Sequence, residues 1–422
     1  MKIEILCTGD EILTGKTVNT NHSYIAQRLT EAGLQMYWGT TVGDDRESLV
    51  AAFQQASLRA DAVIVNGGLG PTVDDLSQEV AAEAAGVELV LHEPWLERLE
   101  DFYRSRNREM PPNNRKQAML PAGCEFIDNP VGTACGFAVN ISGATFYFTP
   151  GVPREMRRMI DDQVIPRILA ASGLKIVTRL KRFHSFGIGE SRADQMLADI
   201  ESMTPAGGVK LGFQSHYPQL ETKLAARASS PEELDSLLLP LEETVRERLG
   251  NFVLCEDSDT LEATVVDLLA AENATLSTME MTSGGAVSQR LVIADTDARI
   301  VRRGIVSRHL SELAASVDLE LDSNSPDLAI AAALAQNMGS VFGSKYSLVL
   351  LVSQEPGDDT TRSGADLFIA IATPQGVKKR QAKFIGGREW VRLGSSEMAI
   401  DCLRRCLLNV PVDEKIDFEH QG

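Results

Sequence analysis

The chain has 422 residues, of which 43% are hydrophobic and 24% charged; this ordinary globular composition excludes a fully disordered protein. Its 41 basic and 59 acidic residues give a net charge of −18, which excludes charge-driven binding to nucleic acid or to an anionic membrane. Because most domains have about 100–200 residues, the length predicts two to four domains.

Neither a signal-peptide pattern nor an apolar run of about 18 residues is found, so we expect a cytoplasmic protein without a membrane span. The six cysteines are scattered along the chain, and no pair has zinc-finger spacing. This distribution predicts neither a disulfide framework nor a structural zinc site.

Strands and helices alternate in the first part of the chain. Short apolar runs predict strands at 3–8, 37–42 and 61–66, and helical spacing predicts helices at 22–32, 46–60, 75–86 and 153–170. Such alternation is typical of a doubly wound α/β domain, whose ligands bind beyond the carboxyl ends of the strands.

The remaining sequence predicts two further domains. Strand-like stretches at 176–186 and 219–228 and an amphipathic helix at 231–249 indicate a small α+β domain. The third block has expected helices near 260–272, 325–338 and 395–408, strands at 346–353 and 365–372, and a polar loop at 354–364.

The strongest motif is GGLGPTVDD, residues 67–75. Glycines let the backbone approach a phosphate, and Asp74 and Asp75 at the start of a helix could hold a divalent metal. The alternative is a plain loop with an aspartate capping the helix. No Gly-Lys-Ser/Thr follows, so this is not a Walker A loop.

Three weaker clusters accompany it. TGDEILTGKTVNTN (8–21) and VGDD (42–45) place further acidic pairs after two other predicted strands, which favours a cation between them and an anionic ligand. NPVGTACG (129–136) predicts a rigid loop, with Arg115 and Lys116 as possible phosphate contacts. Each cluster alone could be an ordinary capped turn or surface loop.

Together with NNRKQAMLP, FTPGVPREM and SFGIGES, these stretches resemble the competence-damage-inducible protein family, CinA, over essentially the whole chain. The resemblance implies a doubly wound molybdopterin-binding-like domain (1–172), a KH-type α+β domain (173–252), an α/β deamidase-like CinA C-terminal domain (253–412) and a tail (413–422). The middle domain has no clear GXXG loop with basic flanks, so we expect no RNA binding.

The resemblance also implies a function for the first domain, the hydrolysis of ADP-ribose to AMP and ribose 5-phosphate with Mg²⁺, Mn²⁺ or Co²⁺. Asp10, Asp74 and Asp75 would be catalytic, and Asp10, Asp44 and Asp75 would hold the metal. The residues expected to bind substrate are Glu11, Asn21, Gly67, Gly68, Gly70, Thr72, Lys116, Asn129, Gly132 and Thr133.

In the third domain the resemblance implies deamidation of nicotinamide mononucleotide by the serine of an A-E-S-C-T-G-G motif. This chain reads MEMTSGG (279–285), with Met281 at the serine position and Thr282 and Ser283 beside it. A thioether cannot form an acyl-enzyme. The Tyr-Ser-Asn-x-x-Lys element is missing and the later Gly-rich loop is altered (SQEPGDDTTRSG), although Arg388 and Arg392 persist. We therefore expect a degenerate, inactive deamidase site.

The main expectation is a metal-dependent ADP-ribose pyrophosphatase with a small nucleotide substrate, and three alternatives stay open. They are a non-catalytic nucleotide- or pterin-binding protein, a molybdenum-cofactor enzyme, and a nicotinamide mononucleotide deamidase. The resemblance further implies a homodimer, with neither nucleic acid nor membrane as a partner.

Overall fold

The structure is a computed structural model that describes residues 1–173, 177–205, 208–321, 323, 325–354 and 364–419. It contains two compact units, Met1–Arg179 with Arg227–Leu234, and Leu180–Ala226 with Asp235–Gly422. The domain boundaries at 172, 252 and 412 stay predictions.

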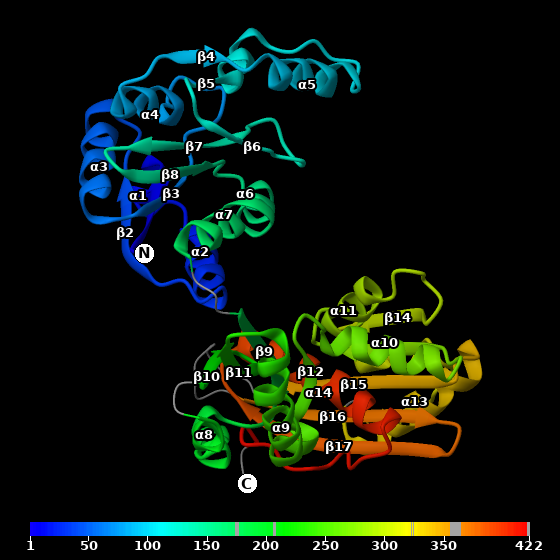
Figure 1. The fold of residues 1–422 in the computed structure, drawn as a ribbon. Coiled ribbons are helices and arrows are strands. Elements are labelled where there is room, and N and C mark those ends of the chain that lie inside the picture. Colours follow the sequence, from blue (N-terminus) through cyan, green and yellow to red (C-terminus); the bar gives the residue numbers. More distant parts are fainter. Residues whose placement is uncertain (174–176, 206–207, 322, 324, 355–363, 420–422) are drawn as a thin grey trace. The chain divides into compact units, whose positions relative to one another are not determined.

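The first unit is built on a mixed six-stranded sheet in the order β2-β1-β3-β8-β7-β6 (Figure 1). Neighbours among β2, β1, β3 and β8 are parallel, whereas β7 and β6 are added antiparallel. A separate pair is formed by β4 and β5. The strands are β1 (Ile3–Thr8), β2 (Met36–Val42), β3 (Ala62–Asn66), β4 (Leu89–Leu91), β5 (Met119–Pro121), β6 (Glu125–Ile127), β7 (Gly136–Ile141) and β8 (Ala144–Thr149).

Helices cover both faces of this sheet. Alternate side chains of a strand pack on opposite faces, so Leu6 and Val65 contact the cluster containing α3 and α4, while Ile5 and Ile64 contact that of α2 and α6. The doubly wound fold is confirmed. The helices are α1 (Asp10–Leu13), α2 (Thr20–Glu31), α3 (Arg46–Arg59), α4 (Ser77–Ala85), α5 (Glu93–Arg104), α6 (Pro153–Met159) and α7 (Ile165–Ser172), with a 3-10 helix at Pro112–Ala118 and a π-helical turn at Ile160–Val164.

A four-stranded sheet in the order β10-β11-β9-β12 follows along the chain. Its strands and helices are β9 (Val177–Phe186), β10 (Val209–His216), β11 (Gln219–Ala228), β12 (Val253–Glu256), α8 (Glu190–Leu197) and α9 (Pro231–Leu249), with short 3-10 helices at Ile200–Met203 and Gly250–Phe252. Helix α9 buries the predicted leucine stripe, including Leu234, Leu238 and Leu241. The α+β character predicted for this region is confirmed, and β10 is a strand beyond those that the sequence predicts.

The C-terminal sheet has the order β14-β13-β15-β16-β17, with β14, β13 and β15 parallel and the last two strands antiparallel. Its elements are α10 (Leu261–Ala271), β13 (Leu276–Met281), α11 (Ala286–Ala294), β14 (Val301–Ser307), α12 (Leu310–Ala315), α13 (Leu328–Phe342), β15 (Tyr346–Gln354), β16 (Gly364–Thr373), β17 (Gly376–Ile385) and α14 (Arg388–Leu407). The predicted helices and strands are present, but α14 begins at Arg388 rather than at 395. Of the predicted loop 354–364, residues 355–363 lie outside the described residues.

All six cysteines are free thiols, and Cys7, Cys135, Cys255 and Cys402 are buried. Among the described residues, no helix combines the length and the apolar character needed to cross a membrane.

Candidate functional site

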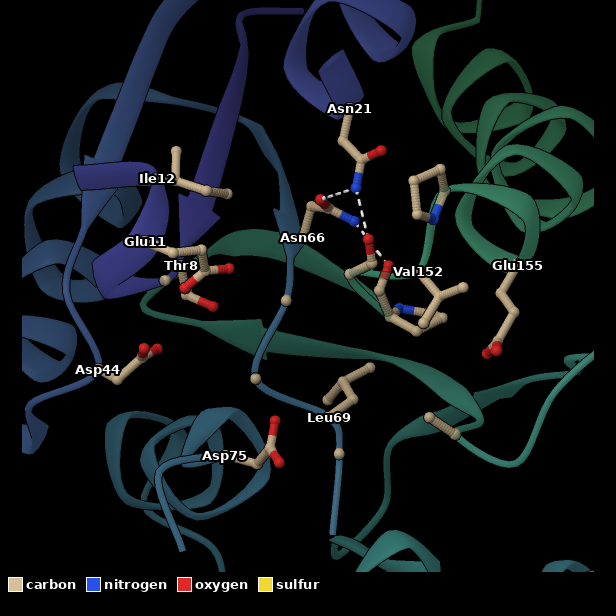
Figure 2. Close-up of a pocket in the computed structure, with 18 of the residues that line it drawn as sticks. Thr8, Glu11, Ile12, Asn21, Asp44, Asn66, Leu69, Asp75, Val152 and Glu155 are labelled. Atoms are coloured by element: carbon tan, nitrogen blue, oxygen red, sulfur yellow. Dashed lines mark hydrogen bonds between the residues drawn. The ribbon is translucent and has the colours of Figure 1, made fainter. Parts of the chain in front are cut away.

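A cavity of about 480 Å³, here called the N-terminal pocket, opens at the carboxyl ends of β1 and β3 (Figure 2). The loops after β1, β2, β3 and β8 all contribute to its wall. The expected site residues that line it are Glu11, Asn21, Asp44, Gly67, Gly68, Gly70, Asp74, Asp75 and Thr133. The expected residues that do not line it are Asp10, Thr72, Lys116, Asn129 and Gly132.

The turn after β3 requires its glycines. Gly67 and Gly68 have φ values of 116° and 68°, which disfavour other residues. A Cβ atom at Gly68 would also lie 2.3 Å from the Ser77 hydroxyl, and one at Gly67 would lie 2.5 Å from the Thr8 hydroxyl. The turn therefore packs closely on β1 and on the start of α4.

Asp75 shapes this loop instead of capping a helix. Its carboxylate accepts a hydrogen bond from the Thr72 backbone N–H at 2.9 Å, and Thr72 also donates its hydroxyl. Helix α4 begins only at Ser77 and has no side-chain cap, so Asp74 and Asp75 precede its first turn, which corrects the expected helix start. Lys116 donates to the Thr72 carbonyl oxygen at 3.2 Å and thus supports the same loop without lining the pocket.

Two of the proposed metal ligands contact each other. The Asp10 N–H donates to the Asp44 carboxylate at 3.1 Å, and the Asp44 N–H donates to the Asp10 carboxylate at 3.2 Å. Burial raises the pKa of Asp44, and the nearby charges of Asp10, Glu11 and Asp74 raise it further, while the bond from Asp10 N–H opposes them.

Carboxylate oxygens are suitable ligands for a divalent cation. However, no group of three or more acidic, histidine or cysteine side chains in the described part of the chain is arranged to hold one. The divalent cation stays a prediction.

Polar residues that end the strands form the base of the N-terminal pocket. The Asn21 amide donates to Asn66 Oδ1 at 2.9 Å and to the Gly151 carbonyl oxygen at 2.7 Å. Figure 2 shows Asn21 and Asn66 facing each other across this base. Within the described residues, Asn21 Oδ1 and Thr8 Oγ1 have no hydrogen-bond partner although both are buried. Thr8 begins the cluster 8–21, but neither Thr8 nor Asn66 is among the expected site residues. Each is the polar last residue of an apolar strand, and that position could have indicated both.

Asn129 positions the loop beside the pocket. Its side-chain oxygen accepts from the backbone N–H groups of Val131 and Gly132, both at 3.0 Å. Its amide donates to the Glu155 carboxylate at 2.7 Å. Glu155 lines the pocket, and burial raises its pKa, opposed by the bond from Asn129. Asn129 is thus placed to support the loop, and Glu155 is a pocket residue that the sequence did not indicate.

A second cavity of about 320 Å³, the C-terminal pocket, lies at the carboxyl ends of β13 and β15 and beside the start of α14. It is rich in hydroxyl and guanidinium groups, unlike the acidic N-terminal pocket. The lining residues are Thr282, Ser283, Arg308, Val352, Gln354, Arg388, Glu389, Val391, Arg392 and Ser395.

The turn between β13 and α11 directs hydroxyl groups into this pocket. Thr282 has a φ of 71°, which is a strained value for a β-branched residue, and its side chain is exposed. Met281 instead packs in the buried cluster with Leu310 and Leu313 and is 6% exposed. Met281 is the last residue of β13 and faces the core, whereas Thr282 lies in the turn that follows and lines the pocket.

The buried carboxylate of Glu280 holds this turn in place through hydrogen bonds. Glu280 is fully buried, and its carboxylate accepts from the Ser283 hydroxyl at 2.6 Å and from the backbone N–H groups of Val287 and Ser288 at 3.0 and 2.7 Å. Ser283 is therefore engaged with Glu280, which leaves Thr282 as the exposed hydroxyl of the turn.

The start of α14 supplies paired charges to the same pocket. Arg392 binds Glu389 through two hydrogen bonds of 2.8 and 2.6 Å. This pairing raises the pKa of Arg392 and lowers that of Glu389. With Arg308 and Arg388 also on the wall, the pocket suits a ligand that carries a phosphate.

Three successive regions of the chain each match a known protein family. Residues 4–170 match the family described as "Probable molybdopterin binding domain", residues 180–254 the "Damage-inducible protein CinA KH domain" and residues 258–407 the "CinA C-terminal domain". A CinA-like protein of Shewanella frigidimarina is 36% identical, covering 98% of this chain and 97% of that protein.

Two further similarities extend this result. A Shewanella oneidensis protein named nicotinamide-nucleotide amidohydrolase PncC is 37% identical over 100% of this chain and 99% of its own length. A crystal structure of a Thermoplasma acidophilum CinA protein is 34% identical, with a TM-score of 0.35, and covers 40% of this chain and 96% of that one.

The name of the Shewanella oneidensis relative contradicts two expectations. The main expectation, ADP-ribose pyrophosphatase activity, is wrong, and so is the expectation that deamidase activity is lost; the alternative of a nicotinamide nucleotide deamidase is the one supported. The second error has a physical reason, because Met281 lies in the core and does not remove the hydroxyl groups that line the pocket.

The three matched regions follow one another in the order of the CinA-like relatives, and the identity extends over almost the entire length of those proteins. This chain therefore belongs to the CinA family.

Proposed function

We propose that the C-terminal domain is an amidohydrolase that converts the carboxamide of a nicotinamide nucleotide to a carboxylate. The observation that carries this proposal is the exposed hydroxyl of Thr282, held at a φ of 71° in a pocket that contains three arginines. The amidohydrolase name of a full-length relative supports it.

The strand–turn–helix position of Thr282 suits a nucleophile. In hydrolases that use a hydroxyl nucleophile, a sharp turn between strand and helix exposes the reacting oxygen. In the proposed reaction Thr282 Oγ1 attacks the amide carbon, ammonia leaves with the hydroxyl proton, and an ester to Thr282 forms. Water then hydrolyses the ester, which releases the carboxylate and restores the threonine.

The arginines supply binding and charge stabilisation. A nicotinamide nucleotide carries a phosphate, for which guanidinium groups are well suited. Arg308, Arg388 and Arg392 lie on the same wall as Thr282, so a phosphate bound there would hold the nucleotide near the hydroxyl. Positive charge next to the reacting carbonyl would also stabilise the oxyanion that develops on attack.

The test measures nicotinate mononucleotide and ammonia released from nicotinamide mononucleotide by the full-length chain. Thr282→Ala is expected to lower kcat at least about 100-fold, while Thr282→Ser keeps the hydroxyl and retains part of the activity. Thr296→Ala, at an exposed threonine beyond the far end of α11, is the matched control and should leave turnover unchanged.

Two results would contradict the proposal. No product from the unmodified chain would remove the amidohydrolase assignment altogether. Full activity of Thr282→Ala together with loss in Ser283→Ala would remove Thr282 as the nucleophile and assign Ser283 instead.

We also propose that the N-terminal pocket binds a nucleotide or a pterin without turning it over. Buried oxygens of Thr8 and Asn21 that lack partners among the described residues support a ligand with hydrogen-bond donors. Calorimetric titration of the chain and of Asn21→Leu with nucleotides and pterins tests this, and equal heats from both proteins would contradict it.

Finally, we propose a homodimer in the cytoplasm. The free thiols of all six cysteines are compatible with a reducing compartment. Light scattering on the purified chain tests the dimer, and a monomer at micromolar concentration would contradict it.

A further inference from the structure

The tip of the β10–β11 hairpin contacts the first turns of α14. Tyr217, between the two strands, stacks on Trp390 with ring centroids 3.3 Å apart and planes inclined by 15°. Its hydroxyl donates to the Trp390 carbonyl oxygen at 3.1 Å. A hairpin of the KH-type domain is therefore attached directly to a helix of the C-terminal domain.

Gly394 allows this close approach. A Cβ atom at position 394 would lie 2.3 Å from the Tyr217 hydroxyl, so a larger residue would displace the hairpin or the helix. Residues 390, 394 and 397 lie on one face of α14, because helical neighbours are three or four positions apart. The hairpin thus contacts a continuous stripe of the helix.

The next contact along this stripe is polar and buried. The Gln219 amide donates to one carboxylate oxygen of Glu397 at 2.6 Å, and Arg290 of α11 binds the other at 2.6 Å. Glu397 is 1% exposed, and Arg290 also pairs with Glu262 of α10. A buried carboxylate is costly unless its partners are in place, so the geometry of this group is tightly coupled.

The C-terminal pocket lies on another face of α14. Val391, Arg392 and Ser395 of α14 line it, one or two positions along the helix from the residues that the hairpin contacts. Helix α11, which carries Arg290, follows directly on the turn of Thr282. Helix α14, which lines the pocket, and helix α11, which continues from the turn that lines it, are here called the pocket helices, and both are fixed through Glu397 to the hairpin.

We propose that Tyr217 and Gln219 are positioning residues for the C-terminal pocket, holding α14 and α11 at the spacing that a phosphorylated nucleotide requires. The catalytic part of this inference rests on the proposed function. The structural part is that the KH-type hairpin keeps the pocket helices conformationally ordered, and this part does not depend on turnover.

This arrangement predicts a particular kinetic signature. The hairpin acts on the arginine-bearing start of α14 more directly than on Thr282, so its loss weakens substrate binding more than the chemical step. Because small displacements of binding groups have large effects, we expect KM for nicotinamide mononucleotide to rise about 10-fold, with kcat reduced less than about threefold.

The experiment compares Gln219→Ala and Tyr217→Ala with the unmodified full-length chain. Gln214→Ala is the matched control, since Gln214 is the same residue type on the same hairpin and is exposed, with Lys223 as its partner. Tyr217→Phe keeps the stacked ring and should retain most of the affinity for nicotinamide mononucleotide. Hydrogen exchange at 282–290 and 388–397 is measured in parallel, with expected acceleration in the two alanine variants only.

The two failures can be told apart. Unchanged KM and unchanged exchange in both alanine variants would overturn the inference, as would an equal effect of Gln214→Ala. If the unmodified chain shows no turnover, the proposed function fails, and hydrogen exchange alone decides whether the hairpin orders the pocket helices.

Discussion

The turn after β3 and the turn after β13 both follow a fully buried strand and both contain residues with positive φ. In the N-terminal turn the positive values belong to Gly67 and Gly68, which pack against Thr8 and Ser77. In the C-terminal turn Thr282 also has a positive φ, and a Cβ atom at Gly284, two positions further on, would meet nothing within 4 Å.

This difference separates two ways of building a site. A tightly packed glycine turn presents backbone N–H groups and has no freedom to accept a side chain. A strained threonine turn presents a reactive side chain, and strain in a β-branched residue persists only where the surrounding structure enforces it. The first turn suits ligand binding and the second suits chemistry.

The largest expected effect comes from alanine at two glycines with nearly the same φ. Gly68 (68°) and Gly284 (72°) should share a conformational cost of about 1–2 kcal/mol. Gly68→Ala adds the collision with Ser77, about 1–3 kcal/mol more, whereas Gly284→Ala adds none. Urea unfolding of both variants measures the difference, and equal losses would mean that packing does not distinguish the turns.

A smaller loss is expected from Glu280→Gln. The buried carboxylate accepts four hydrogen bonds, two of them from Ser288, and has nothing to donate. An amide nitrogen in place of one oxygen would therefore face donors and cost about 1–3 kcal/mol. Ser283→Ala removes only one donor and serves as the milder control. Thermal unfolding monitored by circular dichroism checks that Glu280→Gln loses more stability than Ser283→Ala. Equal stability of Glu280→Gln and the unmodified chain would refute the role of Glu280.

The smallest effects concern one carboxylate in each pocket and have opposite signs. Burial raises the pKa of Glu155, so the stability it contributes is present below its ordinary value of 4.5 and is lost as the pH rises. Pairing with Arg392 lowers the pKa of Glu389, whose contribution is present above 4.5 and is lost as the pH falls.

Near pH 7, Glu155→Gln should therefore raise Tm slightly, by about 1–2 °C, and Glu389→Gln should lower it. Both differences should fade as the pH is lowered below 4.5. Melting curves between pH 4 and 7 test this, and shifts of the same sign in both variants would contradict the contrast between a carboxylate destabilised by burial and one stabilised by an arginine.

Much of the fold could be predicted from the sequence, because continuous apolar runs such as 3–8 and 61–66 indicate strands that are covered on both faces. Strand β13 was missed for a related reason. Its sequence, LSTMEM, mixes polar and apolar residues, yet all six are buried, and Glu280 and Thr278 have internal hydrogen-bond partners. Periodicity cannot show such partners.

That missing strand explains the error at the C-terminal site. Without β13, nothing in the sequence indicated that position 281 faces the core and that position 282 faces the pocket. In the N-terminal site the reverse holds, since the acidic and glycine motifs that follow predicted strands do line one pocket. Residues that support loops from outside the pocket, such as Asn129 and Lys116, could not be distinguished from ligand contacts by sequence pattern alone.

The buried free thiols give each compact unit its own reporter of unfolding. Burial raises the pKa of Cys7 and Cys135 in the first unit, and raises the pKa of Cys255 and of Cys402 to about 12 in the second. A thiol reacts with alkylating reagents as the thiolate, so these four remain unreactive while their unit is folded. Alkylation followed by peptide mass spectrometry would therefore record the opening of the two units separately, in a single sample and without any engineered cysteine.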